Sequence, residues 1–146
     1  DIFVDLPIGR IKPPNNKYTL EQLVPILEEN KNIKFLAISN VTQSSDLQKY
    51  LELIPKHVNL VPKIESPKGV LNIQNITNAL PNVEKHVMLD HDDLFSAIKR
   101  ENEPESKFID YVRTLIDFCK ENKISLLRTV GVIFSDDENR VTQYVK

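Results

Sequence analysis

Short apolar runs alternate along this chain with longer stretches of helical periodicity. The runs are apolar almost throughout, which is typical of strands buried on both faces of a sheet. Polar segments rich in proline, asparagine and glycine, such as residues 7–17, are typical of loops between such elements. The runs predict five strands, over Ile2–Leu6, Ile33–Ile38, Leu60–Ile64, Lys85–Leu89 and Ile124–Val132.

Helices are predicted between these strands. Thr19 can cap the first helix, and Pro25 should kink that helix or delay its start. Ser44 or Ser45 opens the second helix, and Ser66, directly before a proline, opens the third. Their apolar stripes are Leu20, Leu23, Val24 and Leu27; Leu47, Tyr50, Leu51 and Ile54; Val70, Ile73, Ile76 and Leu80; and, in the longest helix over Lys107–Asn122, Phe108, Ile109, Val112, Leu115, Ile116 and Cys119.

The alternation of strands and helices predicts an α/β fold. Helices between buried strands imply a parallel sheet of repeated strand–helix units. A barrel of the TIM type needs eight strands and typically about 250 residues, so we expect an incomplete barrel with about five strands. Residues 1–146 then form a single domain or a barrel fragment. Because an open sheet edge is a liability, we expect missing segments or a second copy of the chain to complete it.

Composition and charge narrow the class of protein. Hydrophobic residues make up 40% and charged residues 27% of the chain, as in ordinary globular proteins. The net charge of −2 gives no support to nucleic-acid or membrane-surface binding. Cys119 is the single cysteine, so we expect a buried structural thiol and no internal disulfide. Without a visible signal peptide or membrane span, a cytoplasmic location is expected.

Charged residues directly follow two successive predicted strands. Lys63 and Glu65 end the third strand, and Asp90, His91 and Asp93 follow the fourth. Barrel enzymes keep their chemistry at the carboxyl ends of neighbouring strands. A lysine and two carboxylates there favour a divalent-metal and oxyanion site, with Glu65 and Asp93 as metal ligands. The simpler alternative is that both carboxylates only stabilise the N-termini of the helices that follow them, and that Lys63 forms a structural ion pair.

Five segments occur in the order of known strand motifs. They are DLPIGRIK (5–12), FLAISNVTQSSDL (35–47), VPKIESPKGVLNIQNI (61–76), VMLDHDDL (87–94) and SLLRTVG (125–131). In this order they resemble the strands of the pyruvate kinase barrel, in the phosphoenolpyruvate/pyruvate superfamily. By this resemblance Lys63 stabilises charge on the transferred phosphoryl group, and Glu65 and Asp93 hold Mg²⁺ or Mn²⁺. Thr129 matches a threonine near the substrate.

The chain also departs from the pyruvate kinase pattern. A short loop stands where that family inserts a cap domain, and His91-Asp92 replaces the arginine and glycine before the final aspartate. Asp92 places negative charge where an anionic substrate approaches, so we expect an activity diverged from pyruvate kinase. The 2-keto-3-deoxy-acid aldolases and citrate-lyase-like enzymes are a second resemblance, because they also have an IE motif followed by a DL motif and need no cap.

The remaining candidate residues are substrate contacts. Arg10 and Lys12 can reach a phosphate or carboxylate, or they belong to a surface loop; His91 can bind substrate or act as a base, or it is solvated. We expect a metal-dependent enzyme acting on phosphoenolpyruvate, pyruvate or a related 2-keto acid, either phosphotransferase-like or a carbon–carbon lyase. The alternative is a catalytically degenerate barrel with a binding or structural role.

Overall fold

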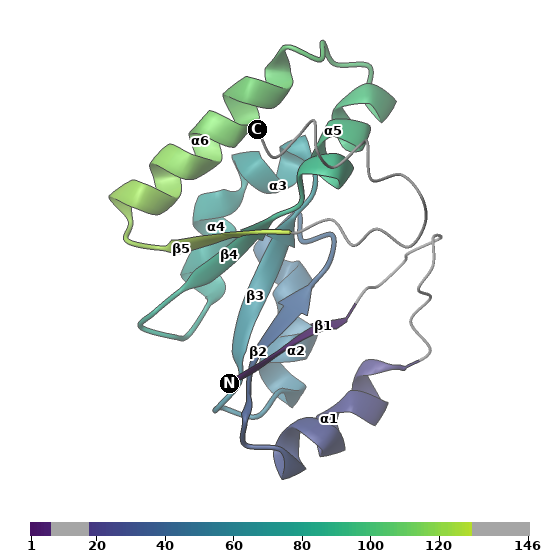
Figure 1. The fold of residues 1–146 in the computed structure, drawn as a ribbon, viewed down its shortest axis with the longest axis vertical. Coiled ribbons are helices and arrows are strands. Elements are labelled where there is room, and N and C mark those ends of the chain that lie inside the picture. The colour runs from purple at the N-terminus through teal and green to yellow at the C-terminus, as the bar shows by residue number, and fades with distance from the viewer. Residues whose placement is uncertain (7–17, 130–146) are drawn as a thin grey trace.

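A single parallel sheet organises the computed structural model, which describes residues 1–6 and 18–129 (Figure 1). Its five strands lie side by side in chain order, and every neighbouring pair is parallel. This is the strand order of a barrel wall, so the predicted α/β fold with an incomplete set of barrel strands is confirmed. The strands are β1 (Ile2–Leu6), β2 (Ile33–Ile38), β3 (Asn59–Ile64), β4 (His86–Leu89) and β5 (Ser125–Arg128).

Helices connect the strands, and two of them begin at the predicted caps. Thr19 forms a capping box with Gln22, and α1 begins directly after it, so Pro25 does not delay the start. The Ser66 Oγ accepts a hydrogen bond from the Gly69 amide at 3.2 Å and starts α3. The helices are α1 (Leu20–Glu29), the 3₁₀ helix η1 (Ser44–Leu47), α2 (Gln48–Leu53), α3 (Pro67–Leu71), α4 (Ile73–Ala79), α5 (His91–Arg100) and α6 (Lys107–Glu121).

The two faces of the sheet have different environments. Alternate strand residues such as Leu36, Ile64 and Val87 are fully buried in the core, and α2, α3 and α4 lie behind the sheet in Figure 1. On the opposite face, Phe3 stacks on Phe35 with 6.1 Å between ring centroids, and Phe3 remains 39% exposed. Within the described residues, β1 and β5 are the two edges of the sheet. The helices therefore cover the face that corresponds to the outside of a barrel.

Three details of the predicted helices are wrong. Leu51, a member of the second predicted stripe, is 36% exposed. The third predicted helix is divided at Asn72 into α3 and α4, although its stripe is buried as expected. On α6, Ile109 and Ile116 are 56% and 46% exposed. The predicted stripe was too wide for the arc that one helix can bury, and the side centred on Leu115 and Cys119 faces the core.

Two further observations bear on the expected class of protein. Burial raises the pKa of Cys119 to about 11, which keeps the thiol protonated and fits the predicted structural role. None of the helices in the described part of the chain has both the length and the hydropathy to cross a membrane.

Candidate functional site

The carboxyl ends of β3 and β4 bring together the charged residues that follow these strands. Ile64 pairs with Leu89 across the two strands, and the Asp90 amide donates a hydrogen bond to the Ile64 carbonyl at 3.2 Å. This bond continues the pairing past the end of β4, so Glu65 and Asp90 are neighbours at the sheet edge. The register of a parallel pair thus places the two acidic segments together, as the sequence predicts.

Lys63 lies at the centre of this group. Its side chain is only 7% exposed, and its ammonium lies 3.3 Å from the Glu65 Oε1 and 3.2 Å from the Asp5 Oδ2. The Ser39 Oγ is a further contact at 3.5 Å, so Lys63 reaches across β2 to β1. Burial alone lowers the pKa of Lys63, but the nearby carboxylates of Glu65 and Asp5 outweigh it and raise that pKa. Lys63 is therefore a buried, fully protonated ammonium.

Glu65 is the most enclosed carboxylate of the group. Its side chain is 4% exposed, and its Oε2 accepts a hydrogen bond from the Asn40 amide at 2.9 Å. Burial raises the pKa of Glu65, and the opposing effects of Lys63 and the Asn40 amide only reduce that rise. Glu65 therefore uses one oxygen for Lys63 and the other for the main chain.

The turn after β2 is shaped to offer that amide. Asn40 adopts a left-handed conformation with φ of 56°, which asparagine tolerates better than most residues. The next amide, that of Val41, donates to the Lys63 carbonyl at 3.3 Å. The Asn72 side chain donates to the Thr42 carbonyl at 2.8 Å, which ties the turn to the helical side of the sheet. These hydrogen bonds thus fix the position of the Asn40 amide, which donates to Glu65.

Asp90, the N-cap of α5, and Asp93, in its first turn, complete an acidic trio with Glu65. Asp90 caps α5 by accepting a hydrogen bond from the Asp93 amide at 3.2 Å. Glu65, Asp90 and Asp93 each offer one carboxylate oxygen, and these oxygens all lie within 4.8 Å of one another. Oxygen ligands at such spacing can close around one divalent cation. The positive end of the α5 dipole also stabilises the negative charges of Asp90 and Asp93, so helix capping and metal binding are compatible at these residues.

The other candidate residues lie around this trio or outside the described part of the chain. The Thr129 amide and hydroxyl both donate to the Leu89 carbonyl, at 3.1 and 3.4 Å, which fixes Thr129 beside the start of the Asp90 turn. His91 opens α5, and its ring centroid lies 6.3 Å from that of Phe108.

Burial and the charge of Arg128 lower the pKa of His91, against the opposing effect of Asp90 and Asp92, so the imidazole is neutral at neutral pH. Arg10 and Lys12, the two predicted contacts for a phosphate or carboxylate, lie outside the described residues.

Asp5 had no predicted role from the sequence, and Asp90 was predicted in the acidic segment but not as a ligand. Asp5 is the second partner of Lys63, and Asp90 is the third carboxylate of the trio. A signal for Asp5 is present in the sequence, because it is the one charged residue inside the apolar run Ile2–Leu6. The signal for Asp90 is its place directly after the β4 run, where a helix cap is expected.

Comparisons with known proteins give a likeness in fold. No family model matches the sequence, and no curated protein matches it. The crystal structure of RipC from Yersinia pestis is similar with a TM-score of 0.59 at 17% identity, over 86% of this chain and 62% of that chain. A pyruvate kinase from Cryptosporidium parvum is similar with a TM-score of 0.60 at 20% identity, over 77% of this chain and 23% of that chain.

This chain spans less than two thirds of the length of either of these proteins. At such identities the likeness concerns the fold alone. The predicted resemblance to the pyruvate kinase barrel is therefore confirmed for the arrangement of strands and helices.

Proposed function

We propose that this chain forms a divalent-metal site that acts on phosphoenolpyruvate, pyruvate or a related 2-keto acid, diverged from pyruvate kinase. The observation that carries the proposal is the buried Lys63–Glu65 pair, which meets Asp90 and Asp93 at the carboxyl ends of two neighbouring strands. Buried charges are costly unless they are paired. Lys63 contacts Asp5 and Glu65. Asp90 and Asp93 add two more carboxylates beside Glu65, which is more negative charge than one ammonium balances. A function that uses a cation explains their presence.

In this proposal Glu65 and Asp93 hold Mg²⁺ or Mn²⁺, and Asp90 contributes a third oxygen. A divalent cation supplies Lewis-acid chemistry, which stabilises negative charge that develops on a substrate oxygen. Lys63 adds a fixed positive charge beside the same oxygens, and its raised pKa keeps it protonated throughout. Thr129 lies at the neighbouring strand end as a substrate contact.

The charge of the described site argues for divergence from pyruvate kinase. Asp5 and Glu65 both contact Lys63, so its ammonium is already engaged before any substrate enters. Asp92 is exposed on the same turn of α5, at the position of the glycine in the pyruvate kinase pattern. An anionic substrate then depends on the metal, and on the proposed substrate contacts Arg10 and Lys12, to overcome this negative charge. His91, as a neutral imidazole, can add a hydrogen bond to the substrate.

Thermal unfolding with Mn²⁺ and Mg²⁺ tests the proposal, each with and without pyruvate, oxalate or phosphoenolpyruvate. A cation at a hundredfold excess over its dissociation constant stabilises the folded protein by about 2.7 kcal/mol. We expect Glu65→Ala and Asp93→Ala to abolish this gain. The matched control is Asp92→Ala, one residue away on the same helix turn but outside the trio, which should keep the gain.

The outcomes separate three interpretations. Stabilisation by metal, together with turnover of phosphoenolpyruvate or a 2-keto acid in an activity assay, supports the enzyme. Stabilisation by metal without any turnover of phosphoenolpyruvate or 2-keto acids supports a barrel that binds but does no chemistry. If wild type gains nothing from either metal, and both alanine variants lose stability equally with and without it, the carboxylates are helix caps and ion-pair partners.

A further inference from the structure

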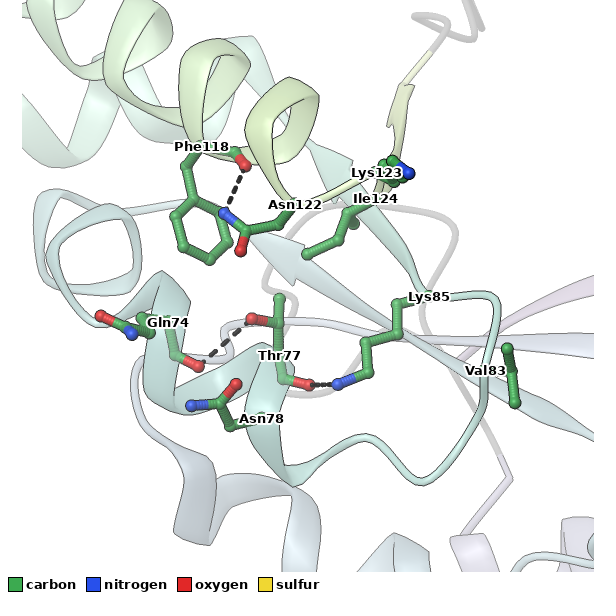
Figure 2. A pocket seen from close by; sticks show the side chains of 9 residues that line it. All are labelled: Gln74, Thr77, Asn78, Val83, Lys85, Phe118, Asn122, Lys123 and Ile124. Carbon is green, nitrogen blue, oxygen red and sulfur yellow. Dashed lines mark hydrogen bonds between the residues drawn. The ribbon is translucent and has the colours of Figure 1, made fainter.

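A small pocket lies at the opposite end of the sheet from the acidic trio. It opens where β4 and β5 begin, because Lys85 directly precedes β4 and Ile124 directly precedes β5, whereas Asp90 follows β4. Its volume is about 170 Å³, many times the roughly 10–15 Å³ that one water molecule requires. Its lining, shown in Figure 2, is Gln74, Thr77, Asn78, Val83, Lys85, Phe118, Asn122, Lys123 and Ile124.

The charge of this lining is positive. Two of the nine residues are lysines, three are primary amides and none is acidic. Within the described part of the chain, neither Lys85 nor Lys123 forms an ion pair with a carboxylate. The whole chain has a net charge of −2. The positive charge of the pocket lining therefore does not reflect the chain as a whole but is confined to this end of the sheet.

Lys85 is held in place by the main chain. Its ammonium donates to the Thr77 carbonyl at 2.7 Å, in the last turn of α4 (Figure 2). An ammonium has three donors, so two remain for a ligand. The bond fixes the direction of the side chain, which reduces the conformational entropy that binding would otherwise remove.

Two helices end at the pocket, and their carboxyl termini ordinarily disfavour an anion. Here one carbonyl near the end of each helix already has a side-chain partner. The Thr77 carbonyl accepts from Lys85, and the Phe118 carbonyl accepts from the Asn122 side chain at 2.9 Å (Figure 2). These two carbonyls are therefore engaged, beside the positive charges of Lys85 and Lys123.

The pocket also has a small apolar part. In Figure 2 the side chains of Phe118 and Ile124 point toward its centre, between Lys85 on one side and Gln74 on the other. Both residues are only half-exposed, so this surface belongs to the edge of the core. A ligand with a charged group and a short carbon chain matches both parts of the lining.

We propose that this pocket binds a small anion that carries a carboxylate or phosphate group. Lys85 and Lys123 supply the positive charge of its lining. The proposal does not depend on the metal site, since the two sites use opposite ends of the sheet and share no residue.

The test titrates isotope-labelled protein with inorganic phosphate and, in a separate arm, with succinate, at ionic strength held constant with chloride. We expect saturable shifts of the backbone amide signals of Asn78, Lys123 and Ile124. The arm that saturates first identifies which anionic group the pocket prefers. No saturable shift with either anion overturns the proposal.

Two variants make the result specific. Lys123 has a φ of 54°, so Lys123→Asn removes the charge with a residue that tolerates this backbone conformation. Loss of one charge-assisted hydrogen bond should weaken binding roughly tenfold. Lys120→Gln is the matched control, because Lys120 is an exposed lysine of α6 outside the pocket. Equal affinity of wild type and Lys123→Asn refutes the assignment.

Discussion

The two ends of the sheet carry opposite charges, in different physical settings. At the carboxyl end, Lys63 and Glu65 lie on or directly after a strand and are almost completely buried. At the amino end, Lys123 lies in a connection and is exposed, and Lys85 is half-exposed. Exposed charges change the free energy of unfolding only slightly, so their presence alone does not indicate a function. Buried charges must be held by partners, so the carboxyl end is where the fold gives up stability for a specific arrangement.

The largest difference between the two ends should appear when Lys63 is changed to Met. This variant leaves Glu65 buried without its ion-pair partner, and the loss should be about 3–5 kcal/mol of unfolding free energy. Urea denaturation at neutral pH measures it. The double variant Lys63→Met, Glu65→Leu should recover much of the loss, because it removes both charges. A loss below about 1 kcal/mol in the single variant shows that water reaches the Lys63–Glu65 pair. The charges at the two ends of the sheet would then not differ in their effect on stability.

Packing beneath the carboxyl end is tested by Gly69→Ala. A Cβ at this position meets the Val41 carbonyl oxygen at 2.8 Å and the Ile64 Cγ2 at 3.3 Å. Alanine in a helix normally gains about 0.5–1 kcal/mol over glycine, but the clash with main chain should reverse the sign and cost roughly 1–3 kcal/mol. Thermal unfolding decides between the two signs. A stabilised variant indicates that the turn after β2, which orients the Asn40 amide, can move freely.

Asp90→Asn separates the two roles of the helix cap. Asparagine caps a helix about as well as aspartate, so stability without metal should change by less than about 0.5 kcal/mol. The variant removes one charge from the acidic trio, and a tenfold loss of Mn²⁺ affinity lowers the stabilisation by metal by about 1.4 kcal/mol. Thermal unfolding with and without Mn²⁺ measures both quantities. An unchanged gain from metal shows that Asp90 is only a cap.

The sequence allowed prediction of the features that depend on neighbouring residues. The apolar runs identified the strands, and Thr19 and Ser66 identified two helix starts, because caps act within a single turn. Lys63, Glu65 and Asp93 were placed at neighbouring strand ends by the order of the elements alone.

The missed features depend on distances between elements. The contact between Lys63 and Asp5 joins residues 58 positions apart and requires the side chain to cross β2. The exposure of Ile109 and Ile116 depends on which side of α6 faces its neighbours. The amino-end pocket combines ends of α4 and α6 with two strand starts, which no local pattern indicates.

A pH dependence distinguishes the buried carboxylate from the exposed charges. Burial raises the pKa of Glu65 above its ordinary value of 4.5. The folded state then binds this proton more readily than the unfolded chain, so the contribution to stability is complete below 4.5 and is lost as pH rises through the raised pKa. Relative to Glu65→Gln, wild type should gain stability as pH falls from neutral to 4.5. Urea denaturation of both proteins across this range tests it, and parallel curves contradict the raised pKa.

The smallest effect is expected for Lys123→Asn without added anion. The side chain is exposed, makes no ion pair among the described residues, and its replacement fits the left-handed backbone, so stability should change by less than about 0.5 kcal/mol. Urea denaturation of Lys123→Asn and Lys63→Met under the same conditions compares the contributions to stability of one lysine from each end of the sheet. With phosphate added, wild type should become more stable than this variant, because only wild type keeps both lysines of the pocket. A loss above about 1 kcal/mol without anion means that Lys123 supports the fold itself, and the positive pocket is then a structural feature of the amino end.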